Sequence, residues 1–270
     1  MMVPLVTVLI PAYQDFNGVE RIISKVPEDL LASGSLEIIV SDDSPDFEIF
    51  KMFETVVPIS KAVRIVKGKR QGAVSNWNTM LEKARGQYIQ FLHHDECPSD
   101  SEFFYSIIEL VKLANKLQDS PIFFHSCMVN FSKSPRLHSR ALYSQLLLHF
   151  FPKFLYRQNF LGSPSILLVP ATRAVEFDAK LKYLVDVDWY DRIRIDINAR
   201  FSQLEVNSYP SSGSITAQIG DNQAIRVLRG EELSYLGTSR YRMKPASIIC
   251  AYMIWAINRL TSYLWSSKSY

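Results

Sequence analysis

Short apolar runs alternate with amphipathic segments along the first half of the chain. The β-branched run at residues 5–10 stops at Pro11, and the segment 16–26 then repeats apolar residues at the spacing of one helix face. The same alternation predicts strands at residues 36–44, 62–66, 87–92 and 121–126, and helices at 49–57, 72–86 and 99–117. Strands that alternate with helices are typical of an α/β protein with a parallel sheet and helices on both faces.

The second half of the chain is less regular. It predicts an apolar, basic helical stretch with a proline break, a strand, an acid-rich helix start and a further strand, at residues 140–158, 162–169, 183–198 and 199–206. No repeat, low-complexity tract or linker separates the halves. We therefore expect one domain over residues 1–240, followed by an amphipathic C-terminal helix at 241–270.

Composition and charge narrow the class of protein. With 270 residues and 47% hydrophobic content, the chain can bury a large core. Thirty basic against 27 acidic residues leave a charge of +3, which argues against a nucleic-acid partner. The three cysteines form no CxxC pair, so a reducing, cytoplasmic location is expected. The N-terminus lacks the basic region and cleavage site of a signal peptide, and the apolar run from Pro245 is shorter than a bilayer span.

Polar groups follow each of the first four predicted strands. They are the segments 11–13, 41–43, 67–72 and 93–96, which read Pro-Ala-Tyr, Ser-Asp-Asp, Lys-Gly-Lys-Arg-Gln-Gly and His-His-Asp-Glu. Ligands of parallel α/β sheets bind beyond the carboxyl ends of the strands. Two acidic clusters and a basic, glycine-containing loop are therefore predicted to meet at one edge of the sheet.

Each group also has a purely structural interpretation. Asp42 and Asp43 suit an acidic turn that caps a helix, and Asp95 and Glu96 suit a helix start. Alternatively, carboxylates at this edge accept hydrogen bonds from a ribose or a base, and acids beside an imidazole suit Mg²⁺ or Mn²⁺. The basic loop matches neither GxxxxGK[ST] nor GxGxxG, so it is not a P-loop, although Gly72 permits a close approach of phosphates.

In this order and spacing, the motifs resemble the inverting glycosyltransferases of family 2, which have the GT-A fold. "VTVLIPAYQD" is similar to the family's opening strand and "EIIVSDDSPD" to its nucleotide-recognising segment. "QGAVSNWNTMLEKARGQYIQFLHHDE" resembles a subset, found in bacterial surface polysaccharide synthesis such as that of O-antigen, in which Asn-Trp-Asn precedes a His-x-Asp-Asp-like motif. The resemblance implies a Rossmann-like, mostly parallel sheet flanked by helices, with a nucleotide-sugar-binding half at 1–126 and an acceptor and catalytic half at 127–240.

The resemblance further implies a nucleotide-sugar donor, with a UDP-sugar expected first and dTDP- and GDP-sugars as alternatives. Asp42 would contact the nucleoside, and Asp95 would bind Mn²⁺ or Mg²⁺ on the diphosphate, with Glu96 as a second candidate ligand. Asn76 and Asn78 would line the donor pocket. The remaining candidates for donor binding are Pro11, Tyr13, Asp43, Lys69, Gln71, Gly72, His93 and His94.

Four positions depart from the family's pattern. Gln14 stands where Asn is usual, Val185 replaces a Glu, and His93 and Glu96 stand where many members have Asp. The last two departures leave the dependence on metal and the preferred ion open.

An inverting enzyme needs a general base for the acceptor hydroxyl, and the resemblance places it in the helix that follows "LGSPSILLV". Asp186 matches best and Asp188 is the alternative, while Asp191 is expected to be an exposed acid that pairs with Arg192 or Arg194. A carboxylate can act at neutral pH because the hydroxyl becomes more acidic as the transition state develops. In the polar loop 209–226, Ser212, Ser214 and Thr216 are candidates for closing over the diphosphate.

The expected acceptor is a glycan or polyprenyl-linked hydroxyl. Basic and aromatic residues at the C-terminus suit a helix that lies on the inner face of an anionic membrane, and packing on the domain is the equal alternative. A non-catalytic nucleotide-sugar-binding protein is the main functional alternative. A sugar nucleotidyltransferase is disfavoured because residues 11–13 lack its glycine-rich opening.

Overall fold

The computed structural model describes residues 3–56, 63–131, 134–139, 141–209 and 221–266. Its centre is one mixed sheet in the order β3-β2-β1-β4-β8-β6-β9-β5, with β7 paired to β6. The strands are β1 (Val6–Ala12), β2 (Leu36–Asp42), β3 (Val63–Lys67), β4 (Tyr88–Phe91), β5 (Glu96–Pro98), β6 (Ile122–Phe131), β7 (Ser134–Ser139), β8 (Leu167–Pro170) and β9 (Ala199–Ser208).

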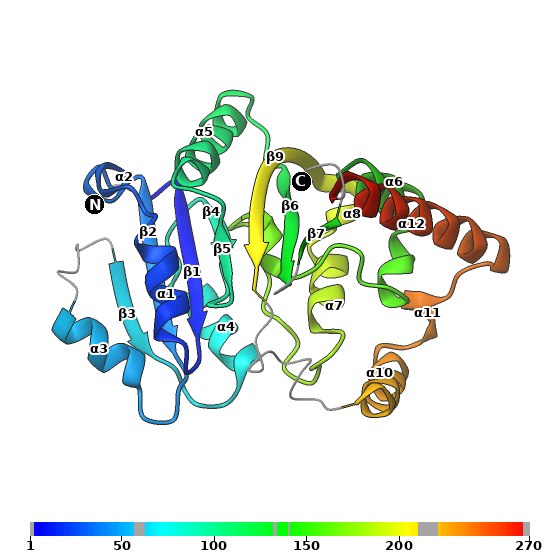
Figure 1. Cartoon of the computed structure of the whole chain (residues 1–270), viewed down its shortest axis with the longest axis horizontal. Helices are drawn as coiled ribbons and strands as arrows, with labels where there is room; N and C mark the ends of the chain where they lie inside the picture. Colours follow the sequence, from blue (N-terminus) through cyan, green and yellow to red (C-terminus); the bar gives the residue numbers. More distant parts are fainter. Residues whose placement is uncertain (1–2, 57–62, 132–133, 140, 210–220, 267–270) are drawn as a thin grey trace.

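Most strands run in one direction. β3, β2, β1 and β4 are parallel, β8 is antiparallel to β4 and to β6, and β9 runs parallel to β6. The register pairs Ala12 with Asp42 and Asp42 with Lys67, so the carboxyl ends of the first three strands are level. Figure 1 shows the arrowheads of β1, β6 and β9 at the same end of the molecule. The predicted fold class, a mostly parallel α/β sheet, is confirmed.

Helices cover both faces of the sheet because side chains along each buried strand alternate between two hydrophobic clusters. On β1, Leu9 packs in one cluster with Trp77 and Met80 of α4, whereas Val8 and Ile10 pack in the other with α1 and α5. The helices of this half are α1 (Phe16–Ile23), α2 (Glu28–Ala32), α3 (Glu48–Val56), α4 (Ala73–Lys83) and α5 (Glu102–Lys116).

Two local differences from the sequence prediction bear on the site. Helix α4 ends at Lys83, earlier than expected, because Gly86 packs against β1 so closely that a Cβ would lie 2.4 Å from the backbone N of Thr7. After β4 the chain turns and re-enters the sheet as β5, beginning at Glu96. The acidic segment is therefore held between two strands rather than at a helix start.

The second half packs around β6, β8 and β9. It contains α6 (Ala141–Phe150), the 3-10 helices η1 (Pro152–Tyr156) and η2 (Pro164–Ile166), α7 (Val185–Arg192), α8 (Ile195–Asn198), α10 (Asn222–Leu236), α11 (Thr238–Tyr241) and α12 (Pro245–Ser266). Helix α12 packs against β7 and α6 (Figure 1), and the Tyr252 ring meets that of Phe154 edge-on at 4.8 Å. Among the described residues, no helix has the length and apolar character needed to cross a membrane.

Candidate active site

The turn after β2 contains both aspartates expected at the nucleoside. Asp42 has no exposed surface, and its carboxylate oxygens accept hydrogen bonds from the backbone N–H groups of Ser44 and Phe50, each at 2.9 Å. These bonds agree with the structural interpretation of Asp42, which shapes the turn into α3. The expected contact of Asp42 with the nucleoside stays a prediction.

Asp43 holds the basic loop against the end of β2. It is 8% exposed and accepts a hydrogen bond of 2.6 Å from the backbone N–H of Arg70. Burial raises the pKa of the Asp43 carboxyl, and backbone N–H groups of Arg70 and Gly72 partly oppose this rise. Gly68 must be glycine here, because a Cβ would lie 2.5 Å from a carboxylate oxygen of Asp43. The loop's exposed residues at this edge are Lys69, Arg70, Gln71 and Gly72.

The two asparagines of α4 use their amides inside the protein. Asn76 is 2% exposed, accepts from the Ser41 hydroxyl at 2.5 Å and donates to the Ser41 carbonyl at 3.1 Å. Asn78 donates to the Phe177 carbonyl at 2.9 Å and accepts from the Phe177 N–H at 2.7 Å. Both residues therefore fix α4 to its neighbours through their side-chain amides, and their expected place in the donor pocket stays a prediction.

The end of β1 presents one open side chain to the site. Tyr13 is 38% exposed, whereas Pro11 is buried and its carbonyl oxygen lies 3.3 Å from Nδ1 of His94. The backbone at His94 is also close to α1, since a Cβ on Gly18 would lie 2.2 Å from its carbonyl oxygen. His94 is thus packed between β1 and α1, and Tyr13 remains the better candidate for ligand contact.

His93, Asp95 and Glu96 come together where β4 passes into β5. Their potential ligand atoms lie within 4.8 Å of one another. The His93 ring stacks on Trp77 with 5.1 Å between centroids, and Glu96 Oε1 accepts from the Ser163 hydroxyl at 2.6 Å. The candidate ligands Asp95 and Glu96 are therefore adjacent as expected, and His93 joins them.

The donor set of this cluster fits a divalent cation. Among the described residues, Nε2 of His93 and Oε2 of Glu96 are buried and have no hydrogen-bond partner. Burial raises the pKa of both carboxyls, and the charge of Glu96 raises that of Asp95 further. Burial also lowers the pKa of His93 to about 4, so the neutral ring keeps a lone pair at pH 7. A cation would satisfy acceptors that otherwise remain unpaired.

Asp186 lies in the first turn of α7 and shares the electrostatic environment of this cluster. Its side chain is partly buried, and Oδ1 is inaccessible to solvent and has no hydrogen-bond partner in the part of the chain that the structure describes. Burial raises the pKa of the Asp186 carboxyl to about 7, and the charge of Glu96 adds to the rise. A carboxyl with these properties suits proton transfer near neutral pH.

Asp188, the alternative base, is committed to ion pairs. It is 2% exposed, and its two oxygens lie 2.6 Å from Nε of Arg192 and from Nη1 of Arg240. This buried carboxylate between two guanidinium groups links α7 to α11, and removal of one partner from such a pair is strongly destabilising. The expected pairing of Asp191 is also corrected, because its Oδ2 accepts from the Tyr156 hydroxyl at 3.1 Å.

A further acid that sequence reasoning missed holds the start of α7. Glu232 of α10 is 4% exposed and accepts backbone hydrogen bonds from Lys182, Tyr183 and Leu184 at 2.6, 3.1 and 2.7 Å. The helix thus receives its N-terminal acceptor from a side chain distant in sequence. Glu232 sits in an ordinary amphipathic segment, so no local signal marks it.

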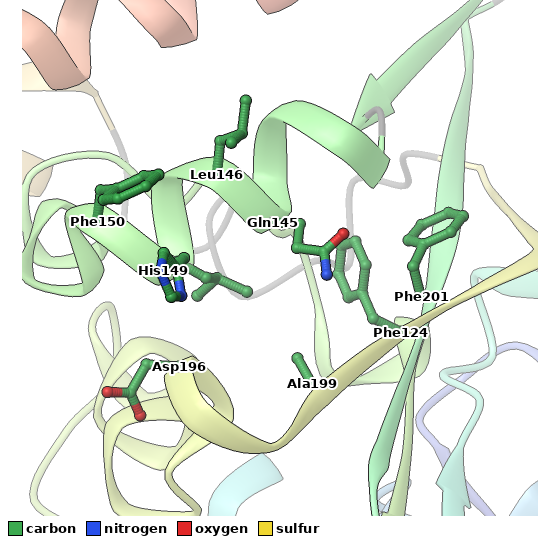
Figure 2. A pocket seen from close by; sticks show the side chains of 9 residues that line it. Phe124, Gln145, Leu146, His149, Phe150, Asp196, Ala199 and Phe201 are labelled. Carbon is green, nitrogen blue, oxygen red and sulfur yellow. The ribbon is translucent and has the colours of Figure 1, made fainter.

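The remaining predicted loop residues, Ser212, Ser214 and Thr216, lie outside the described residues. A cavity of about 630 Å³ opens elsewhere, between α6, α8 and the first halves of β6 and β9 (Figure 2). Figure 2 shows Gln145 and His149 of α6 across from Asp196 of α8. No predicted donor-site or catalytic residue lines this cavity, whose walls are Phe124, Gln145, Leu146, Leu148, His149, Phe150, Asp196, Ala199 and Phe201.

Comparisons with known proteins agree with this arrangement. The structure superposes on the mannosyltransferase PcManGT of Pyrobaculum calidifontis, solved with GDP-Man and Mn²⁺, with a TM-score of 0.56 and 16% identity over 93% of this chain and 70% of that one. It matches S. aureus TarS 1-349, solved with UDP-GlcNAc, with a TM-score of 0.52 and 12% identity over 91% and 79% of the two chains. These likenesses establish the GT-A fold.

Sequence comparisons supply the family. The chain is similar to uncharacterized protein MT1568 of Mycobacterium tuberculosis (strain CDC 1551 / Oshkosh). The two sequences are 25% identical in an alignment of 208 residues that covers 71% of this chain. The match spans 62% of the length of that relative. The profile described as Glycosyl transferase family 2 matches residues 7–179, which is more than half of the chain. The match includes the carboxyl ends of β1 to β4 and the cluster of His93, Asp95 and Glu96. The chain therefore belongs to glycosyl transferase family 2.

Proposed function

We propose that the protein is an inverting glycosyltransferase that moves a sugar from a nucleoside diphosphate sugar to a hydroxyl group. One observation carries this proposal. In the described part of the chain, Oδ1 of Asp186 is buried without a hydrogen-bond partner, and the charge of Glu96, a member of the cluster of His93, Asp95 and Glu96, contributes to the raised pKa of this carboxyl. A base that feels the charge of a cation site suits displacement at a sugar carbon whose leaving group is a diphosphate.

The chain's own residues supply three contributions to this reaction. Asp95 and Glu96 would hold a Mn²⁺ or Mg²⁺ ion, whose charge neutralises the diphosphate as it leaves. Tyr13 and the exposed loop beginning at Lys69 border the place of the nucleoside and phosphates. Asp186 takes the proton of the acceptor hydroxyl as the new oxygen–carbon bond forms. The bond from the sugar carbon to the phosphate oxygen breaks, and the nucleoside diphosphate keeps its electron pair.

Thermal shift with UDP, GDP, dTDP and CMP, each with and without Mn²⁺, tests donor binding. A ligand at about 100 times its Kd stabilises the fold by about 2.7 kcal/mol, and we expect UDP with Mn²⁺ to give the largest shift. PcManGT and TarS were solved with different nucleotide bases, so the fold leaves this choice to experiment. If none of the nucleotides shifts the transition, donor binding is refuted.

Hydrolysis of the bound donor separates an enzyme from a binding protein. We expect wild-type protein to release the nucleoside diphosphate slowly from its sugar, and Asp186→Asn to bind the donor equally well without this release. If wild-type protein binds the donor but never cleaves it, with water or with any acceptor glycan, the non-catalytic alternative is correct.

We further propose a lipid-linked glycan acceptor at a membrane surface, as in assembly of a bacterial surface polysaccharide. Helix α12 packs on the domain along one side, while Ile249, Met253 and Leu260 are 62, 60 and 65% exposed on another. The exposed cations Arg242 and Lys244 precede this stripe. An apolar stripe flanked by cations suits an anionic bilayer surface.

Liposome co-sedimentation tests this contact. We expect the full chain to sediment with vesicles that contain anionic lipid at low salt, and Ile249→Asp with Met253→Asp to abolish sedimentation. The variant Val227→Asp, which changes an exposed apolar residue on α10, is the matched control. Equal sedimentation of all three proteins, or of none, would refute the membrane proposal and leave the donor chemistry untouched.

A further inference from the structure

The cluster of His93, Asp95 and Glu96 contains a histidine whose ring is held in place by its aromatic neighbours. His93 stacks on Trp77 at 15° between ring planes and meets the Phe91 ring at 6.4 Å between centroids. Its backbone N–H is anchored by the Ser165 hydroxyl at 3.2 Å. The imidazole is thus oriented by packing and by the backbone, and its Nε2 is buried and has no hydrogen-bond partner within the described ranges.

The neighbouring carboxylate has the same unsatisfied character. The Glu96 side chain is only 6% exposed, and Oε2 lies 3.5 Å from Nδ1 of His93 without a hydrogen-bond partner among the residues that the structure describes. Its other oxygen is fixed by Ser163. Leaving a buried acceptor unpaired is unfavourable, and a cation shared by both residues would remove this penalty at two atoms together.

We propose that the His93 imidazole is a direct metal ligand, together with Asp95 and Glu96, and that it makes the site select Mn²⁺ over Mg²⁺. This inference rests on the proposed function, because it concerns the same cation site. Imidazole nitrogen is a ligand for first-row transition ions, and Mn²⁺, although it also accepts oxygen ligands, belongs to that series. Mg²⁺ instead requires oxygen ligands in a near-octahedral arrangement. An oxygen-only site would accept Mg²⁺ readily, and one nitrogen in three protein ligands disfavours it.

Electron spin-echo spectroscopy of Mn²⁺ added alone to the full-length protein gives the direct test. A nitrogen bonded to Mn²⁺ produces a ¹⁴N modulation, which we expect from wild-type protein and not from His93→Asp. His149→Asn changes an exposed histidine of α6 and should keep the modulation. If Mn²⁺ alone binds too weakly to observe, the spectrum is recorded with UDP present.

Titration calorimetry then compares the two ions. We expect wild-type protein to bind Mn²⁺ more tightly than Mg²⁺. His93→Asp should reduce the ratio of the Kd for Mg²⁺ to the Kd for Mn²⁺ by about 10- to 100-fold, the range by which metal affinity falls when residues around a metal site are substituted. His149→Asn should leave the ratio at the wild-type value.

The outcomes separate this inference from the proposed function. A ¹⁴N modulation without any binding of a nucleoside diphosphate would support His93 as ligand and refute donor binding. Binding of UDP with Mn²⁺ and no modulation, or no Mn²⁺ binding in either condition, would overturn the inference. The wild-type spectrum decides the assignment of the ligand even if His93→Asp fails to fold.

Discussion

Replacing Asp186 with Asn removes a carboxyl whose ionisation opposes folding. Its pKa rises from the ordinary value near 4 to about 7, chiefly through burial and secondarily through the charge of Glu96. The folded protein therefore holds a proton that the unfolded chain has already lost between pH 4 and 7. Since the native state binds more protons in this range, the free energy of unfolding falls as pH rises.

The size of this effect follows from the shift. Three pKa units at 1.36 kcal/mol each correspond to about 4 kcal/mol, reached above pH 7 and absent below pH 4. For a chain of this length, about 2 °C in Tm per kcal/mol translates this into about 8 °C. Asp186→Asn should therefore melt higher than wild-type protein at pH 8, and the difference should shrink steadily towards pH 5.

Melting curves from pH 5 to 8 without metal or nucleotide measure the difference directly. Asp46→Asn, at an exposed acid after β2, is the control that should run parallel to wild-type protein. Parallel curves for Asp186→Asn and wild-type protein would refute the argument, because they would show that the Asp186 carboxyl titrates alike in the folded and unfolded chains.

The same pKa governs catalysis. A general base must be ionised, so kcat/KM of wild-type protein should rise with pH and level off above an apparent pKa of about 7. In Asp186→Asn the rate should fall by about 10²- to 10⁴-fold, the usual contribution of a general base, while the donor still shifts the Tm. A variant that keeps most of its activity would exclude Asp186 as the base.

Three further substitutions test the supporting contacts. Glu232→Ala should lower the free energy of unfolding in urea by about 2–4 kcal/mol and slow sugar transfer, because three backbone N–H groups before α7 lose their acceptor. Glu231→Ala, at an exposed position, should change neither quantity. Asp188→Asn should lower stability by about 3 kcal/mol in the same assay and keep the apparent pKa of kcat/KM, and a lost pH dependence would instead identify it as the base. Asp42→Asn should lower the Tm without changing the Kd for UDP, because its carboxylate binds backbone N–H groups. Weaker binding of UDP at an unchanged Tm would instead indicate that Asp42 contacts the nucleoside.

The first half of the chain was largely predictable because its order is local. Each strand from β1 to β4 is an apolar run, each connecting helix has an apolar face, and parallel pairing places their ends at one edge. The place of Asp95 and Glu96 beyond the carboxyl end of β4 followed from that rule. Their surroundings did not, because β5 pairs with β9 at Glu96 and Ser208, residues far apart in the sequence.

The protein partners of polar side chains near the site could not be predicted from the sequence. Asp42, Asn76 and Asn78 all bind protein groups in the structure, and a motif alone does not tell a side chain that contacts a ligand from one that braces the loop beside it. In each case the distinguishing fact is a partner, such as the Phe50 N–H or the Phe177 backbone. Short-range backbone acceptance is a common use of Asp and Asn.

The proposed general base shows most clearly how the second half of the chain depends on contacts that the sequence does not reveal. The pKa of the Asp186 carboxyl is raised because the carboxyl is buried and feels the charge of Glu96, and we expect that burial to depend on where α7 begins. The start of α7 is fixed by Glu232, which accepts the Leu184 N–H from 48 residues along the chain. Neither Asp186 nor Glu232 reveals this arrangement by itself. If α7 began elsewhere and the Asp186 carboxyl became exposed to solvent, its pKa would return to that of an ordinary surface acid. The raised pKa of Asp186 thus depends on the long-range contact between Glu232 and the backbone before α7. We expect Glu232→Ala to lower the apparent pKa of any activity that remains, and a pH–rate profile of that variant measures this change.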